Sequence, residues 1–346
     1  MTTKLKKILG YLLTIVIVVV SLWLAAKDIN FTKFWNILKE ADYLFILLPV
    51  PVILISHWIR AVRWKTMLEP ALKKRSPSLS YLFSAVMIGY AVNCVITRLG
   101  EFLRPYVYAR QEKVSYSTVL ATIVVERFID LFVVIFMFLI ALLFSGDKLL
   151  NIFPEIDTKS IIIIAAAFLG ILLISFYPPF FRIVLKKLIK PVSEKLYDKL
   201  NELYINFHNG FAVLKTKSQY FKLSLESAEI WLLYSLSLYI MFFAFDFQSE
   251  LNLGFMAGII LIAISGMGVA IAPSPGAIGV YHLIITQILV NLYGVDKEEA
   301  FAFATVAHLV NYVIQLGLGG IYFLKENINN VKEITENQTE DQGNSI

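Results

Sequence analysis

Long runs of apolar residues recur along the whole chain, and they constrain its fold more than any other feature. A transmembrane helix needs roughly 20 apolar residues. Candidate segments lie at 8–26, 43–59, 117–144, 160–178, 228–245, 251–272 and 300–324, with shorter stretches at 79–96 and 280–293. Hydrophobic residues are 58% of the 346 residues and charged residues are 16%, so a soluble domain could not bury this apolar surface. The sequence predicts an all-α, multi-pass membrane protein. It excludes a soluble enzyme, a nucleic-acid-binding protein and a disulfide-rich scaffold.

The basic loops predict the orientation, because Lys and Arg are enriched on the cytoplasmic side of membrane proteins. Basic residues are concentrated near the N-terminus and in the loops around 60–75 and 182–222. Segment 79–116 must then enter and leave on the cytoplasmic side, which predicts a re-entrant helical hairpin. A second broken pair, 251–272 with 280–293, is expected to enter from outside. The pattern predicts about six full spans plus two oppositely oriented re-entrant hairpins. These form an inverted repeat, with both termini cytoplasmic.

We expect a single transmembrane domain over residues 1–324 and a polar, partly disordered cytoplasmic tail over 325–346. Within the domain, residues 182–226 form a basic connector whose apolar residues have helical spacing. Two interpretations of this connector stay open. It packs on the cytoplasmic helix ends, or it forms a surface helix that attracts anionic lipid.

Three charged residues, Glu126, Arg127 and Asp130, lie within the apolar run 117–144. A charge at the centre of a transmembrane helix costs about 2.5–3.5 kcal/mol. Glu126 and Asp130 are four residues apart and share a helix face, so they need arginine partners or a shared proton. One interpretation is a structural ion-pair network; the other is the wall of a polar site or a proton acceptor.

A second polar group, Asn93, Arg98, Gly100, Glu101 and Arg104, lies at the turn of the first predicted hairpin. Arginine suits bidentate binding of phosphate or carboxylate, and glycine permits a tight bend or a close backbone approach. The alternative is a basic loop that only sets the topology.

The segment from Pro273 through Pro275 and Gly276 to Gly279 breaks one helix before another begins. The free N–H groups of the second helix would form an anion site, and His282 lies in its first turn. The alternatives are a plain interhelical turn and a structural histidine.

Secondary candidates for the lining of a cavity are His308, Asn311 and Gln315, which form one stripe on the last span, and Arg60 and Arg63. Such a stripe also serves as helix–helix hydrogen bonds. The four histidines lack metal-ligand spacing and no Walker loop is present, so we predict no metal site and no cofactor.

Four motifs resemble the lysylphosphatidylglycerol synthase transmembrane-region family, also called flippase-like. They are Arg60-Ala61-Val62-Arg63-Trp64, the run from Asn93 to Arg104, Glu126-Arg127-Phe128-Ile129-Asp130, and the run from Pro273 to Val280. Order and spacing agree from about residue 8 to residue 324. The resemblance implies a protein of the prokaryotic cytoplasmic membrane. It also implies that a membrane domain of this kind moves a charged lipid across the bilayer, while a separate soluble domain attaches the amino acid in bifunctional members.

Some positions depart from the family pattern. Ile96 stands where a proline is usual, Ala277 replaces the second glycine of a pair, and His282 stands near the place of a glutamate. The chain ends just after the last span, so we expect no aminoacyl-transfer domain; a phosphatidylglycerol lysyltransferase name, which members of the family can carry, would then be misleading for this chain.

The leading hypothesis is therefore a flippase for a charged or phosphate-bearing phospholipid or lipid-linked substrate. Arg98, Arg104 and Arg127 would meet the phosphate, while Glu101, Glu126 and Asp130 would balance the arginines. The rivals are a membrane subunit or scaffold for a separate lipid synthase or glycosyltransferase, a lipid-modifying enzyme, and a small-solute transporter. No nucleic-acid partner is expected, and a homodimer stays open.

Overall fold

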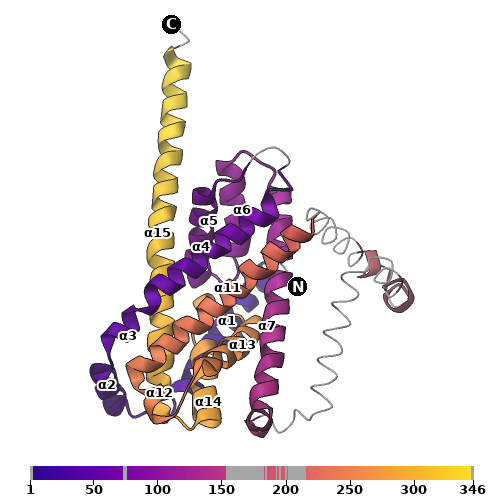
Figure 1. The fold of residues 1–346 in the computed structure, drawn as a ribbon. Helices are drawn as coiled ribbons and strands as arrows, with labels where there is room; N and C mark the ends of the chain where they lie inside the picture. Colours follow the sequence, from indigo (N-terminus) through magenta and orange to yellow (C-terminus); the bar gives the residue numbers. More distant parts are fainter. Residues whose placement is uncertain are drawn as a thin grey trace.

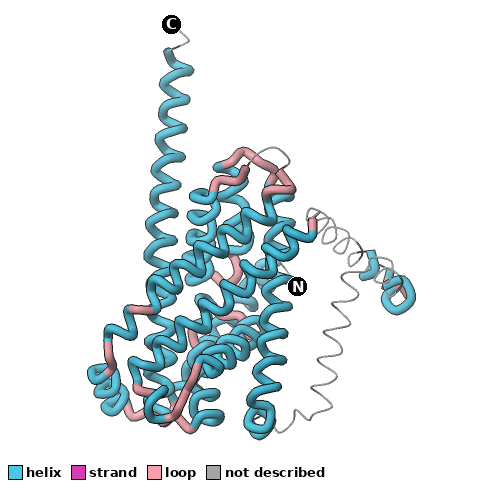
Figure 2. Tube along the Cα trace, viewed as in Figure 1, coloured by secondary structure: helices cyan, strands magenta, loops and turns pink. Residues whose placement is uncertain are grey.

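The computed structural model describes residues 3–72, 76–152 and 216–343, together with residues 183, 185–191, 193, 194, 196–198 and 201. These residues form helices joined by loops, without a strand among them (Figure 2). The predicted span 160–178 and 20 of the 45 residues of the predicted connector 182–226 lie outside the described residues.

The helices of the first half follow the predicted apolar segments, with one addition at 31–40. They are α1 (Thr3–Ala26), α2 (Phe31–Glu40), α3 (Tyr43–Leu47), α4 (Pro49–Leu68), α5 (Leu79–Val95), α6 (Gly100–Gln111) and α7 (Tyr116–Ile152).

The second half contains a π-helical turn η1 (Leu185–Ile189), α11 (Lys217–Phe242), η2 (Phe243–Phe245), α12 (Phe247–Glu250), α13 (Phe255–Ile271), η3 (Pro275–Ala277), α14 (Val280–Tyr293) and α15 (Lys297–Gly343). Helix α15 runs the length of the bundle and projects beyond one end (Figure 1). The sequence predicts a disordered tail from residue 325, whereas the structure continues the helix to Gly343. No proline interrupts 325–343, and extending an existing helix avoids the cost of nucleation.

Five of the described helices are long and apolar enough to cross a membrane, or up to six if α1 and α2 form one bent span. Helix α13, expected as one arm of the second broken pair, has 17 residues and belongs with the shorter apolar helices. One assignment differs from the prediction. Residues 280–293, expected to be too short, join η3 in an apolar segment of 19 residues, Pro275–Tyr293. Pro275 begins this segment, and proline is tolerated in the first turn of a helix.

The turn from α1 into α2, where the chain bends by 82°, was not predicted from the sequence. Asn30 caps α2, since its side chain accepts hydrogen bonds from the backbone N–H groups of Thr32 and Lys33. Lys33 then binds Asp296, with 2.7 Å between Nζ and Oδ2, and so ties α2 to the turn before α15.

Helices α5 and α6 form an antiparallel hairpin whose two arms pack closely. The side chain of Asn93 accepts a 2.8 Å hydrogen bond from the backbone N–H of Gly100. A Cβ atom at Gly100 would overlap the carbonyl oxygen of Gly89, so only glycine permits this approach. With 17 and 12 residues, the arms are shorter than the roughly 20 residues of a full span.

The turn of this hairpin meets the break between α13 and α14. Arg98 donates a 2.9 Å hydrogen bond to the carbonyl oxygen of Ala270 at the end of α13. A Cβ atom at Gly276 would lie 3.3 Å from the Cα of Cys94, and Tyr312 donates to the Cys94 carbonyl at 3.3 Å. Two segments far apart in sequence therefore join inside the bundle.

Helix α15 makes one close contact with α5 at a glycine, Gly319. Gly319 and the nearby Gly317, which makes no such contact, are therefore a matched pair for mutation. A Cβ atom at Gly319 would overlap the carbonyl oxygen of Met87, while no described atom lies within 4 Å of the corresponding position at Gly317. We predict that Gly319→Ala lowers the free energy of unfolding by about 1–3 kcal/mol through overpacking. Gly317→Ala should leave it unchanged or raise it by up to roughly 1 kcal/mol. Denaturant titration of both variants in detergent measures this, and equal effects would contradict the packing.

Candidate functional site

A cluster of ionic side chains joins α4, α6 and α7. The Nη1 atom of Arg60 lies 2.6 Å from Oε1 of Glu126 and 2.9 Å from Oδ2 of Asp130. Arg63 reaches Asp130 at 2.8 Å. Arg104 approaches Glu126 at 3.1 Å, and Arg127 approaches it at 2.8 Å. The predicted ion-pair network is therefore present in the structure, and the two arginines ranked as secondary are its central members.

The side chains at the centre of the cluster are almost completely buried. Glu126 and Arg63 are 0% exposed, and Arg60, Arg104 and Asp130 are at most 8% exposed. At its edge, Arg127 lies 4.0 Å from Glu101, and both side chains are partly exposed. Among the described residues this ion-paired group contains four arginines and three carboxylates, so it carries a surplus of one positive charge.

Helical spacing and one aromatic ring fix the arginines in place. Arg60, Arg63 and Trp64 share one face of α4, because residues three and four apart lie on the same side of a helix. The guanidinium carbon of Arg104 lies 3.9 Å from the centre of the Trp64 ring, a cation–π contact. Trp64 in turn donates a 2.9 Å hydrogen bond to the hydroxyl of Thr122 on α7.

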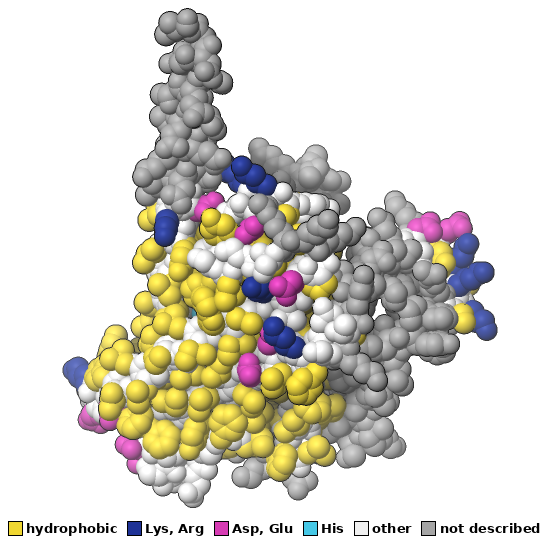
Figure 3. All heavy atoms as spheres, turned by 45° about the horizontal axis from the view of Figure 1, so that its top comes forward, with side chains coloured by type: hydrophobic (Ala, Val, Ile, Leu, Met, Phe, Trp, Pro, Cys, Tyr) yellow, Lys and Arg dark blue, Asp and Glu magenta, His cyan; other side chains and the backbone are white. Residues whose placement is uncertain are grey.

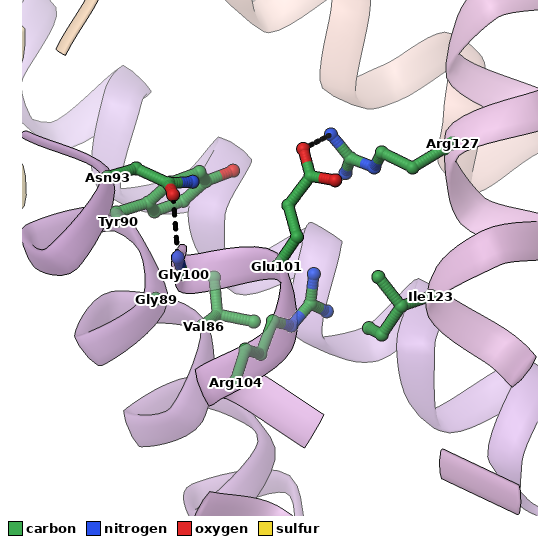
Figure 4. Close-up of a pocket in the computed structure, with 9 residues that line it drawn as sticks. All are labelled: Val86, Gly89, Tyr90, Asn93, Gly100, Glu101, Arg104, Ile123 and Arg127. Carbon is green, nitrogen blue, oxygen red and sulfur yellow. Dashed lines mark hydrogen bonds and ion pairs between the residues drawn. The ribbon is translucent and has the colours of Figure 1, made fainter. Parts of the chain in front are cut away.

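A pocket lies beside the cluster, between α5, α6 and α7 (Figure 4). It is a small, half-open pocket of about 310 Å³ when the open space at its mouth is counted, and its lining consists of Val86, Gly89, Tyr90, Asn93, Gly100, Glu101, Arg104, Ile123 and Arg127. The Nε and Nη2 atoms of Arg104 are buried without a hydrogen-bond partner among the described residues. The surplus positive charge therefore coincides with unpartnered donors at the pocket wall.

Exposed apolar side chains flank this pocket on the helices that line it. Leu99, the residue before α6, and Phe102 on α6 are 42% and 57% exposed, and Val124 and Leu131 on α7 are 41% and 48% exposed. Figure 3 shows one face of the molecule on which hydrophobic side chains predominate and a few charged ones interrupt them. An amphiphile could place a polar group in the pocket and its chains against the exposed apolar side chains of α6 and α7.

A second polar group surrounds the break between α13 and α14. The Nε2 atom of His308 lies 2.7 Å from the carbonyl oxygen of Gly276. The rings of His282 and His308 are 4.7 Å apart, centre to centre. Gln315 bonds to Asn311 at 3.0 Å and contacts the sulfur of Cys94 at 3.6 Å. The structure thus joins His282 with the predicted polar stripe of α15.

The remaining predicted residues have more local positions. Arg98, with a φ of 60°, bonds to the Ala270 carbonyl and is not part of the pocket lining. Pro273 precedes η3, and Pro275 begins it. Gly279, with a φ of 83°, allows close contact with α1, since a Cβ atom there would lie 2.8 Å from the Val18 carbonyl oxygen. The predicted anion site at the start of α14 stays a prediction.

Two buried polar residues near the cluster were not among the candidates. His57, one turn before Arg60 on α4, is 1% exposed, packs 4.7 Å from the Tyr90 ring and has no partner for either ring nitrogen among the described residues. Glu226 on α11 is 5% exposed and accepts a 2.9 Å hydrogen bond from Thr66. The sequence signal for both was faint: a histidine in an apolar run and a glutamate at the edge of a span.

Fold and site together define a multi-pass helical membrane protein with a buried arginine–carboxylate cluster. The family model for the lysylphosphatidylglycerol synthase TM region matches residues 11–319. The chain belongs to this family, as the motifs predicted.

Two curated archaeal relatives match most of their own length. The UPF0104 membrane protein PH1989 of Pyrococcus horikoshii is 26% identical over 92% of this chain and 97% of its own. The UPF0104 membrane protein MJ1078 of Methanocaldococcus jannaschii is 28% identical over 69% of this chain and 95% of its own.

A third relative is longer. Glycosyltransferase AglD of Haloferax volcanii is 21% identical over 92% of this chain but only 54% of its own length. No solved structure matches this chain.

We predict that loss of a buried carboxylate of the cluster lowers the free energy of unfolding more than loss of an exposed one. Glu126→Gln should lower the free energy of unfolding by about 3–5 kcal/mol, because it leaves buried arginines without a counter-charge. Glu101→Gln should change it by no more than about 1 kcal/mol, since this pair is long and partly exposed. Unfolding of both variants in detergent tests this, and a small effect at Glu126 would contradict a structural role for the cluster.

Proposed function

We propose that the chain moves a phosphate-bearing phospholipid or lipid-linked substrate between the leaflets of the bilayer, as a flippase. The observation that carries the proposal is the surplus positive charge with unpartnered Arg104 donors at the pocket wall. Arginine donors suit phosphate oxygens, and a charged side chain within a membrane protein marks a substrate path by default.

In this proposal, each part of the site has a separate role. Arg104 and Arg127 bind the phosphate, while Glu126 and Asp130 hold the arginines in position. The exposed apolar residues of α6 and α7 keep the acyl chains in contact with the membrane. The hairpin α5–α6 and the pair α13–α14 would be the two re-entrant elements of an inverted repeat, and their contact at Arg98 and Ala270 would separate the two leaflets.

We also propose that both termini are cytoplasmic and that the protein resides in a prokaryotic cytoplasmic membrane. The turn between α4 and α5, the start of α11 and the end of α15 lie at one end of the bundle (Figure 1). Basic residues in the segments 65–75 and 182–222 support a cytoplasmic position for this end. The membrane proteins from Pyrococcus and Methanocaldococcus support the prokaryotic context.

A second candidate function is that of a membrane partner for a separate glycosyltransferase. It is favoured by the similarity to AglD, in which 92% of this chain aligns with 54% of a protein named as a glycosyltransferase. A comparable division of labour between two chains would place the lipid-binding part here and the transferase elsewhere.

Transport is tested by leaflet-resolved quenching of fluorescent phosphatidylglycerol in liposomes that contain the purified protein. We predict that Arg127→Gln slows transfer by about tenfold or more, because a hydrogen bond to a charged group contributes roughly 1.5–3 kcal/mol. Arg110→Gln, on the exposed face of α6, is the matched control and should transfer at the wild-type rate.

No transfer by wild-type protein would exclude the flippase. Co-purification of a glycosyltransferase that loses activity without this chain would then support the partner role. Equal transfer by wild type and Arg127→Gln would remove the pocket from the proposal.

A further inference from the structure

The pocket has a definite charge balance, which limits the headgroup it can accept. We infer that it selects a headgroup with one net negative charge, such as a phosphodiester, and that Glu101 sets this limit. The inference rests on the proposed lipid substrate and adds to it a charge class and a residue that determines specificity.

The surplus positive charge of the cluster lies at Arg104. Oε1 of Glu126 contacts Arg60, Arg104 and Arg127 within 3.1 Å, and Asp130 accepts from Arg60 and Arg63. Arg104 has only one nitrogen engaged in this way, while its Nε and Nη2 atoms are buried without a partner among the described residues. Arg104 is 6% exposed and lines the pocket, so the surplus is available to a ligand.

Three further charged residues lie next to the cluster. Glu226 lies beyond Arg63, but Lys222 approaches it at 3.8 Å, so the pair adds no net charge. Arg98 directs its guanidinium to the Ala270 carbonyl. Arg98 keeps its own positive charge, but it is exposed and lies outside the pocket lining, so the cluster by itself carries a surplus of one positive charge.

The surplus charge determines which net charge of a headgroup the pocket favours. In a medium of low dielectric constant, an uncompensated charge is costly. A monoanion neutralises the cluster, whereas a dianion such as a phosphomonoester leaves one negative charge and an uncharged headgroup leaves one positive charge. The balance therefore favours a phosphodiester over both.

Glu101 is the one carboxylate of the cluster that faces the pocket rather than the buried arginines. Its side chain points toward Arg127 across the mouth (Figure 4), at 4.0 Å from Nη1. Because it is partly exposed and weakly paired, its charge can be removed without disrupting the buried network. Glu101→Gln would raise the surplus to two charges and so match a dianion.

The same chemistry could come from a lipid or from a soluble phosphodiester. The exposed apolar residues Leu99 and Phe102, on either side of the Gly100–Glu101 segment, favour the lipid. A soluble ligand would gain nothing from them.

The test is binding of short-chain lipids to the purified full-length protein in detergent at pH 8, measured by calorimetry. The probes are dihexanoyl phosphatidylglycerol, a monoanion, and dihexanoyl phosphatidic acid, whose phosphomonoester is close to a dianion at this pH. Wild type should prefer the phosphodiester by about tenfold, the size of one charge interaction over roughly 10 Å at an effective dielectric constant of about 20. Glu101→Gln should remove or reverse this preference.

The matched control is Glu40→Gln, which removes the same charge from the exposed end of α2, far from α6 in Figure 1. It should keep the wild-type preference. An unchanged preference in Glu101→Gln, or the same change in Glu40→Gln, would overturn the inference. Equal binding of glycerophosphoglycerol, which has the headgroup without chains, would overturn the lipid as the source.

Binding and transport can fail separately. Charge-selective binding without lipid transfer in liposomes would exclude the flippase and keep the site. Lipid transfer by wild type without charge-selective binding would keep the flippase and overturn this inference alone.

Discussion

The rest of the structure depends on the need to compensate charges buried within an apolar bundle. Three arginines and two carboxylates of the cluster lie at most 8% exposed, and isolated charges could not remain there. Their pairing requires α4, α6 and α7 to meet at one point. The cluster therefore specifies how these helices pack as well as what they can bind.

The short hairpin α5–α6 brings the cluster to a pocket. Glycine contacts let its arms approach, the hydrogen bond from Gly100 to Asn93 orders the start of α6, and Arg104 then lies one turn further along. From there its guanidinium lies over Trp64 and reaches Glu126. The short hairpin thus places the unpartnered hydrogen-bond donors of Arg104 where a lipid headgroup could reach them. The proposed function follows from this placement.

Much of this arrangement could be predicted from the sequence. The apolar runs gave most of the described helices, and Glu126, Arg127 and Asp130 stood out because charges within an apolar run need partners. The identity of those partners was harder. Arg60 and Arg63 were only secondary candidates for the lining of a cavity, since a linear sequence does not show that α4 packs against α7. The contact between His282 and His308 was not predicted for the same reason. It depends on how the helices pack and not on the spacing of the two residues in the sequence.

The errors in the prediction also have physical causes. Helix α2 was missed because its amphipathic residues lack the long apolar run of a span, and the 82° bend before it depends on local capping by Asn30. Arg98 was expected to bind phosphate; the structure places its guanidinium on the Ala270 carbonyl of the other helical pair, and phosphate binding at Arg98 stays a prediction. Residue type alone does not distinguish a basic side chain that binds a ligand from one that joins two segments.

The most direct test of this account is a cryo-electron microscopy structure of the protein in nanodiscs that contain phosphatidylglycerol. The account predicts density for a headgroup phosphate within hydrogen-bond distance of the Nε and Nη2 atoms of Arg104, with the acyl chains along α6 and α7. A headgroup bound elsewhere, with these two atoms still unpartnered, would contradict the claim that the surplus charge of the cluster is the lipid-binding site.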